Sequence, residues 1–122
     1  MSRSKQKGTA WETAVVRYLQ DFSPVVERRA LHGGKDKGDV AGIPGVVIEC
    51  KNEKTLTLAA YVDEAVAEGD NADADVAAAW IHRRGKASPA DGYVVMTGTQ
   101  FVSLLIAAGH LPATDTSQEN TA

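Results

Sequence analysis

Cysteine, aromatic residues and long apolar runs are all scarce in this chain of 122 residues. The single Cys50 excludes an internal disulfide and a zinc site made of cysteines alone, which fits a reducing compartment. No apolar run approaches the roughly 20 residues of a membrane-spanning helix, and the basic start lacks the apolar stretch of a signal peptide. We therefore expect a soluble, cytoplasmic protein with no membrane partner.

The chain also lacks an excess of positive charge. Thirteen Lys and Arg residues stand against sixteen Asp and Glu, a formal net charge of -3, so only local basic clusters could predict a nucleic-acid partner. A hydrophobic content of 43% suits one compact domain with a modest core, which we place at residues 8–111. The polar ends predict a flexible basic arm at 1–7 and a disordered tail at 112–122.

Hydrophobic periodicity predicts three helices, at 9–22, from 58 to 69 or one turn later, and around 101–108. Strands are expected at 25–31, in two short segments of 38–51, at 75–82, where the alanines leave a helix possible, and at 93–97. The order α-β-β-β-α-β-β-α predicts the α/β class, with a mixed β-sheet flanked by helices.

The stretch GDVAGIPGVVIECK, residues 38–51, predicts a hairpin that carries three charged residues. Glu49 and Lys51 share one face, and a three-residue loop at 43–45 would place Asp39 opposite Glu49 with Cβ atoms roughly 5 Å apart. Two such carboxylates repel each other unless a cation lies between them or one is protonated. Oxygen ligands of this kind are what Mg²⁺ prefers, and Lys51 would then face an anion beside the metal.

Each of these residues also has a structural interpretation. Glu49 and Lys51 could form a solvated ion pair on an exposed sheet face, worth at most about 1 kcal/mol. Glu12 completes a capping box with Thr9, yet it also borders the apolar stripe of its helix and could point toward the sheet, so both roles stay open. The thiol of Cys50 faces away from Glu49 and is expected to fill the core.

These residues resemble the PD-(D/E)xK nucleases, which have the restriction-endonuclease-like fold, and among them the small Holliday junction resolvases of archaea and bacteriophages. The resemblance covers about residues 7–105. The family's helix glutamate is matched by Glu12, its strand aspartate by Asp39, and its E-x-K strand by Glu49 and Lys51; Gly38 stands in place of the signature proline before the aspartate.

The resemblance implies Mg²⁺-dependent hydrolysis of phosphodiester bonds in DNA, with Mn²⁺ as a substitute. It implies that Asp39, Glu49 and the main-chain carbonyl of Cys50 hold metal. Glu12 would help to hold metal or orient water, and Lys51 would assist the attacking water. If the chain is encoded by a phage, its compartment is the host bacterial cytoplasm.

Basic residues gather in or beside this stretch and in one later loop, and they predict contacts with the phosphate backbone. The expected DNA-binding residues are Lys7, Arg28, Arg29, Lys35, Lys37, Lys54, Arg83 and Arg84. The resemblance implies branched double-stranded DNA as the partner and hydrolysis during DNA recombination. Symmetric cutting of a junction predicts a two-fold homodimer, with a contact at 101–106 or in the Ala-rich segment near Trp80.

Two other functions remain open at this point. One is a different PD-(D/E)xK nuclease that acts on flaps, duplex ends or a restriction site. The other is a non-catalytic DNA-binding module in which the charges only decorate the sheet.

Overall fold

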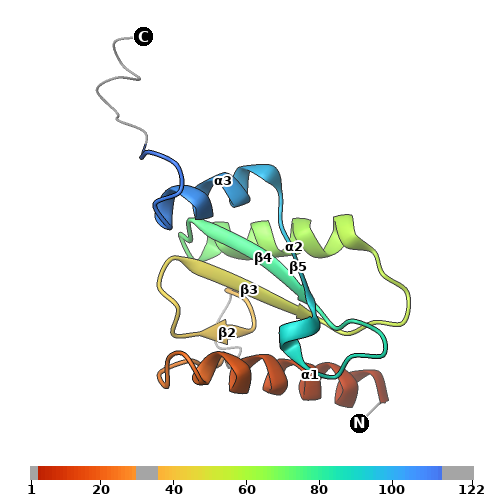
Figure 1. Cartoon of the computed structure of the whole chain (residues 1–122). Helices are drawn as coiled ribbons and strands as arrows, with labels where there is room; N and C mark the ends of the chain where they lie inside the picture. The colour runs from red at the N-terminus through yellow and green to blue at the C-terminus, as the bar shows by residue number, and fades with distance from the viewer. Residues whose placement is uncertain (1–2, 30–35, 114–122) are drawn as a thin grey trace.

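The structure is a computed structural model that describes residues 3–29 and 36–113. Its elements follow one another along the chain as α1 (Arg3–Gln20), β1 (Glu27–Arg28), β2 (Val40–Ala41), β3 (Val46–Lys51), α2 (Leu58–Asn71), β4 (Val76–Ile81), the 3-10 helix η1 (Pro89–Asp91), β5 (Tyr93–Val95) and α3 (Gly98–Ala107) (Figure 1). The predicted mixed α/β class is confirmed. None of the helices in the described ranges has the length and apolar composition that a bilayer crossing requires.

The strands form two small sheets instead of the single sheet expected. In the larger sheet β4 lies between β3, which runs parallel to it, and β5, which runs antiparallel. The smaller sheet is the antiparallel pair β1–β2. The predicted strand at 25–31 is reduced to Glu27–Arg28, because Val26 still belongs to a turn in which its N–H donates to the carbonyl of Ser23 at 3.2 Å. Residues 30 and 31 lie outside the described ranges.

The larger sheet separates α1 on one face from α2 on the other (Figure 1). Side chains along β3 point alternately to the two faces of the sheet, so the strand contributes to the packing on both faces. Val47 packs with Ala65 of α2. Ile48 and Cys50 face the other way and join a cluster that contains Trp11 of α1. The predicted alternation of β3 is therefore confirmed, and so is the prediction that the thiol of Cys50 fills the core.

Helix α1 begins earlier than predicted. It starts at Arg3 and not at Thr9, so the predicted arm at 1–7 is helical over the part that the structure describes. Lys and Gln are good helix formers, and the single Gly8 is not enough to stop the helix. Thr9 consequently lies inside the helix, where backbone N–H groups already bond to carbonyls four residues earlier, and the predicted capping box is wrong. Most of the predicted tail, residues 114–122, lies outside the described ranges.

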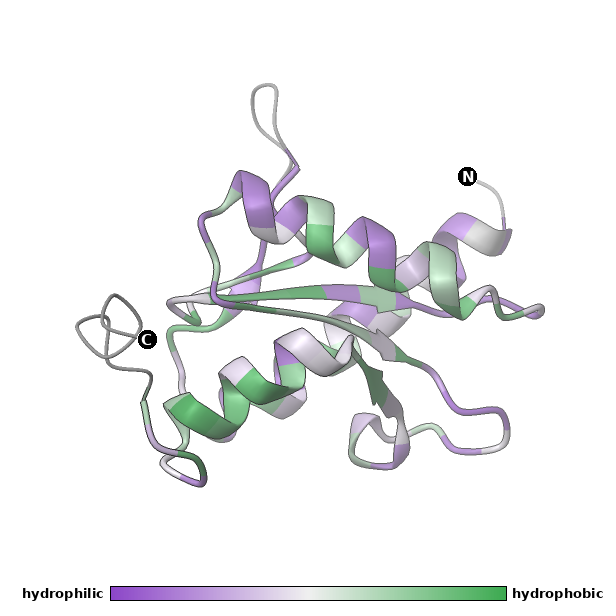
Figure 2. Cartoon of the chain, turned by 90° about the horizontal axis from the view of Figure 1, so that it is seen from above, coloured by the Kyte–Doolittle hydropathy of each residue, from purple (hydrophilic) through white to green (hydrophobic). Residues whose placement is uncertain are grey.

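The C-terminal part covers the open side of β4. Beyond the end of β5, the N–H of Ala77 donates to Oε1 of Gln100 at 2.7 Å, so a side chain of α3 continues the hydrogen bonding of the strand. Val76 to Ala79 are buried, which removes the Ala-rich segment near Trp80 as a contact surface for a second copy. In contrast, Phe101 and Val102 of α3 are exposed, and Figure 2 shows how hydrophobic this helix near the C-terminus is.

Candidate active site

The turn between β2 and β3 brings the acidic residues together. The N–H of Val46 donates to the carbonyl of Ile43 at 3.2 Å, and Gly45 has φ of +79°, as the third residue of a type II turn requires after Pro44. This turn encloses two residues, where three were predicted, and Gly42 at φ of +99° bends the chain behind it.

The register consequently differs from the predicted one. The N–H of Asp39 donates to the carbonyl of Ile48 at 3.0 Å, so the predicted backbone pairing of Asp39 with Glu49 is wrong by one residue. The aspartate side chain reaches further along β3, where its Oδ2 accepts a hydrogen bond from the N–H of Cys50 at 2.7 Å. The structure therefore brings the carboxyl groups of Asp39 and Glu49 together by a different route.

Both carboxyl groups bind protons more tightly than usual. Burial, followed by the charge of Glu49, raises the pKa of Asp39 to about 8, although the hydrogen bond from Cys50 opposes the rise. Burial raises the pKa of Glu49 to about 9; the hydrogen bond and charge of Glu68 and the charge of Glu64 add to this, while Lys51 opposes it. Without a cation, both carboxyl groups therefore tend to carry a proton at neutral pH, which relieves their repulsion.

Lys51 lies beside these acids as a charged ammonium. Its Nζ is 2.7 Å from Oε2 of Glu64 and 3.5 Å from Oε1 of Glu49, and it lies 5.5 Å from the ring centre of Tyr61. Burial alone would lower the pKa of Lys51, but the hydrogen bond with Glu64 and the charges of Glu49 and Glu64 outweigh burial and raise it. Glu49 is only 6% exposed, so these two residues are not the solvated surface pair that was the alternative prediction.

Glu12 points from α1 toward the same place. It accepts hydrogen bonds from Nε and Nη2 of Arg28 at 3.1 and 2.8 Å, and its charge contributes to the raised pKa of Asp39. It also lines a hollow of about 400 Å³ together with Glu49 and Lys51. Of its two predicted roles, the one directed at the sheet agrees with the structure.

The predicted basic residues divide into two groups. Lys7 and Lys54 line the hollow at the site and also a neighbouring hollow of about 490 Å³, which Arg84 helps to line. Arg29 instead lines a different hollow beside the turn at 42–46, and Arg83 lies over the ring of Tyr93, 5.4 Å from its centre.

The structure therefore places Arg29 away from the hollow at the site, whereas Arg83 lies in the later loop for which basic residues were predicted separately. The guanidinium of Arg83 is held over the ring of Tyr93 by a cation–π contact. Arg28 is paired with Glu12, Lys37 is exposed, and Lys35 lies outside the described ranges.

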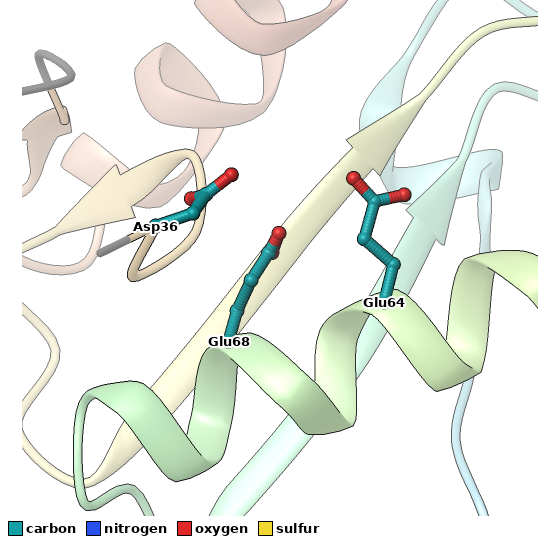
Figure 3. Close-up of side chains that lie close together, drawn as sticks. All are labelled: Asp36, Glu64 and Glu68. Carbon is teal, nitrogen blue, oxygen red and sulfur yellow. The ribbon is translucent and has the colours of Figure 1, made fainter. Parts of the chain in front are cut away.

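Three acidic residues that were not among the predicted site residues lie next to this site. Asp36, Glu64 and Glu68 each offer a carboxylate oxygen, and these oxygens lie within 4.8 Å of one another (Figure 3). Glu68 follows Tyr61 and Ala65 at helical spacing on the buried stripe of α2. A glutamate at a core position of an amphipathic helix is a signal that the sequence does carry.

Comparison of the chain with family models, with curated proteins and with solved structures gives no match.

Proposed function

We propose that this chain is a Mg²⁺-dependent, structure-selective DNA endonuclease with a restriction-endonuclease-like fold. The observation that carries the proposal is the position of Glu49 on β3, the edge strand of the larger sheet. There Glu49 interacts with both Asp39 and Lys51. Two acids with raised pKa values beside an ammonium group, next to a hollow, are typical of metal-assisted hydrolysis. The order of the elements and the helices on both faces of the sheet support the fold.

The donor atoms fit a hard divalent cation. Oε2 of Glu49 is buried, and no amide, hydroxyl or amine of the described residues donates to it, so the oxygen is left for a proton or a metal. Carboxylate oxygens with room for water are the ligands of Mg²⁺. Asp39, Glu49 and the carbonyl of Cys50 would hold the ion, with Glu12 beside them.

When bound, Mg²⁺ polarises a phosphate oxygen and lowers the pKa of a water ligand. Lys51 stays protonated, so it donates hydrogen bonds to the phosphate or to the attacking water and offsets the negative charge that develops on the phosphate. Glu12, held by Arg28, orients water from the α1 side. Lys7, Lys54 and Arg84 line the adjoining hollows and suit contacts with the phosphates that flank the cleaved bond.

A Holliday junction is the substrate that we propose, on the strength of the sequence resemblance. Two symmetric cuts by a chain with one such site call for a two-fold homodimer. Phe101 and Val102 on the exposed side of α3 are the residues that we propose for the contact.

A panel of DNA substrates tests the function. Four-way junctions, flaps, duplexes and single strands are incubated in Mg²⁺ with the wild type and with Asp39→Asn, Glu49→Gln and Lys51→Ala. Glu27→Gln, an exposed change on β1, is the matched control. We expect the wild type and the control to cut junctions, and each site variant to lose on the order of 100-fold or more in rate while still binding DNA.

The other results of the panel are equally informative. Preferred cutting of flaps or ends would keep the chemistry and replace the substrate. Binding without cutting in every case would indicate a DNA-binding module. Equal cutting by the wild type and all three site variants would refute the assignment of these residues.

A further inference from the structure

Two glutamates on α2 face the same side as the site residues of β3. Glu64 and Glu68 lie one helical turn apart, so their side chains project from one face of the helix. Figure 3 shows them pointing, with Asp36, into a shared space in front of β3. The three nearest carboxylate oxygens lie within 4.8 Å of one another. Like charges this close repel one another, and like charges one turn apart also weaken a helix; Lys51 offsets the charge of Glu64 but not those of Asp36 and Glu68.

Glu68 is the buried member of this cluster. Its residue is 3% exposed, and no amide, hydroxyl or amine of the described residues donates a hydrogen bond to either of its carboxylate oxygens. The neighbouring group that can share a proton with it is the carboxyl of Glu49. A buried carboxylate without a partner is strongly disfavoured, so this side chain needs either a proton or a cation.

Burial raises the pKa of Glu68 to about 7; the hydrogen bond with Glu49 opposes this rise, and the charges of Asp36 and Glu64 add to it.

Asp36 is held in place by α2. Its backbone carbonyl accepts a hydrogen bond from Nδ2 of Asn71, at the end of the helix, at 2.8 Å. Its Oδ1 accepts from the N–H of Gly38 at 2.9 Å, which leaves the other carboxylate oxygen for a ligand. The aspartate is therefore fixed opposite the two glutamates before any ligand binds, as a preorganised site requires.

We propose that Asp36, Glu64 and Glu68 form a site for a hard divalent cation, Mg²⁺ or Mn²⁺, separate from the one at Asp39 and Glu49. Three carboxylates on two elements, with positions left for water, are the donor set that such ions prefer over softer metals. The contact between Glu49 and Glu68 joins the two sites. The inference goes beyond the proposed nuclease function and does not require that the chain cuts DNA.

Titration of the full chain with Mn²⁺ alone, without DNA, tests this site. The number of bound ions is counted by calorimetry and by the electron paramagnetic resonance of free Mn²⁺. We expect two ions for the wild type and one for Glu68→Gln, which keeps the shape of the side chain and removes its charge. Asp36→Asn should bind the same ion at least tenfold more weakly. Asp63→Asn, an exposed change on α2, should keep both.

Asp39→Asn separates this inference from the proposed function. Loss of one ion in Glu68→Gln and of the other in Asp39→Asn supports both sites. Loss in Glu68→Gln alone supports the α2 site and removes the metal from the proposed active site. If Glu68→Gln and Asp36→Asn, shown to be folded by circular dichroism, both bind Mn²⁺ like the wild type, the α2 site is refuted and the nuclease proposal is untouched. No binding by the wild type would refute both.

Discussion

Glu49 offers the sharpest physical test of the site, because its carboxyl is buried beside other acids. Its pKa is raised to about 9 from an ordinary value of 4.5. Between these two values the folded protein keeps a proton that the unfolded chain has released. The free energy of unfolding therefore falls as the pH rises through this window, and the penalty is absent below pH 4.5.

The expected size follows from the number of protons retained. Each retained proton lowers the free energy of unfolding by about 1.4 kcal/mol per pH unit, or about 3 kcal/mol between pH 6 and pH 8. Glu49→Gln cannot ionise, so its slope should be shallower by about one proton. Since the Glu49 charge also contributes to the raised pKa of Asp39, the variant should weaken the proton affinity of that residue as well.

The assay is urea unfolding at pH 6, 7 and 8, followed by circular dichroism in the presence of EDTA. The wild type should lose stability as the pH rises, and Glu49→Gln should lose less. Glu27→Gln, the exposed control, should follow the wild type. Added Mn²⁺ should flatten the slope of the wild type, because the ion replaces the protons. A wild-type stability that is flat or rises with pH, or an equal slope in Glu49→Gln, would refute the reasoning.

Two further predictions concern the scaffold of the site. Gly38→Ala should lower the free energy of unfolding by at least about 1 to 2 kcal/mol, because φ is +91° and the new Cβ would lie 2.9 Å from Cγ1 of Val47; Gly85→Ala, at φ of +81° with no atom within 4 Å, is the control for the backbone alone, and an equal loss in both would contradict the predicted clash. Trp11→Phe should cost about 1 to 3 kcal/mol in urea unfolding, because the indole N–H donates to the carbonyl of Trp80 at 3.0 Å; an unchanged midpoint would contradict this.

The long, strongly patterned elements could be predicted from the sequence. The apolar spacing along α2 predicted its position, and the apolar run ending at Ile81 predicted β4, although its alanines also left a helix possible. Such segments adopt the conformation that buries their apolar side chains, and the spacing of those side chains can be read from the sequence. The alternation of β3 likewise predicted that Glu49 and Lys51 share a face.

The short and junctional features could not be predicted in the same way. The start of α1 depends on helix propagation through residues without an apolar pattern, so the Thr9–Glu12 string was mistaken for a cap. The register of Asp39 depends on the turn and on the bend at Gly42, neither of which a count of residues reveals. Gly38 stands in place of the proline of the motif that the chain resembles, and its positive φ and its close approach to β3 suit glycine and exclude proline.

The charges around Lys51 connect the two proposals. Lys51 is bound to Glu64 at 2.7 Å, and an ammonium that is paired with a carboxylate is less available to a phosphate. A cation held by Glu64, Glu68 and Asp36 would take over the charge of Glu64 and leave Lys51 free to face the phosphate. If both proposals hold, an ion on α2 would prepare the site for DNA, because phosphates would approach only after metal had neutralised the acids. Mn²⁺ should therefore tighten DNA binding by the wild type more than by Glu68→Gln. An equal effect on both would show that the cation site on α2 is not coupled to DNA binding at the site of Asp39 and Glu49.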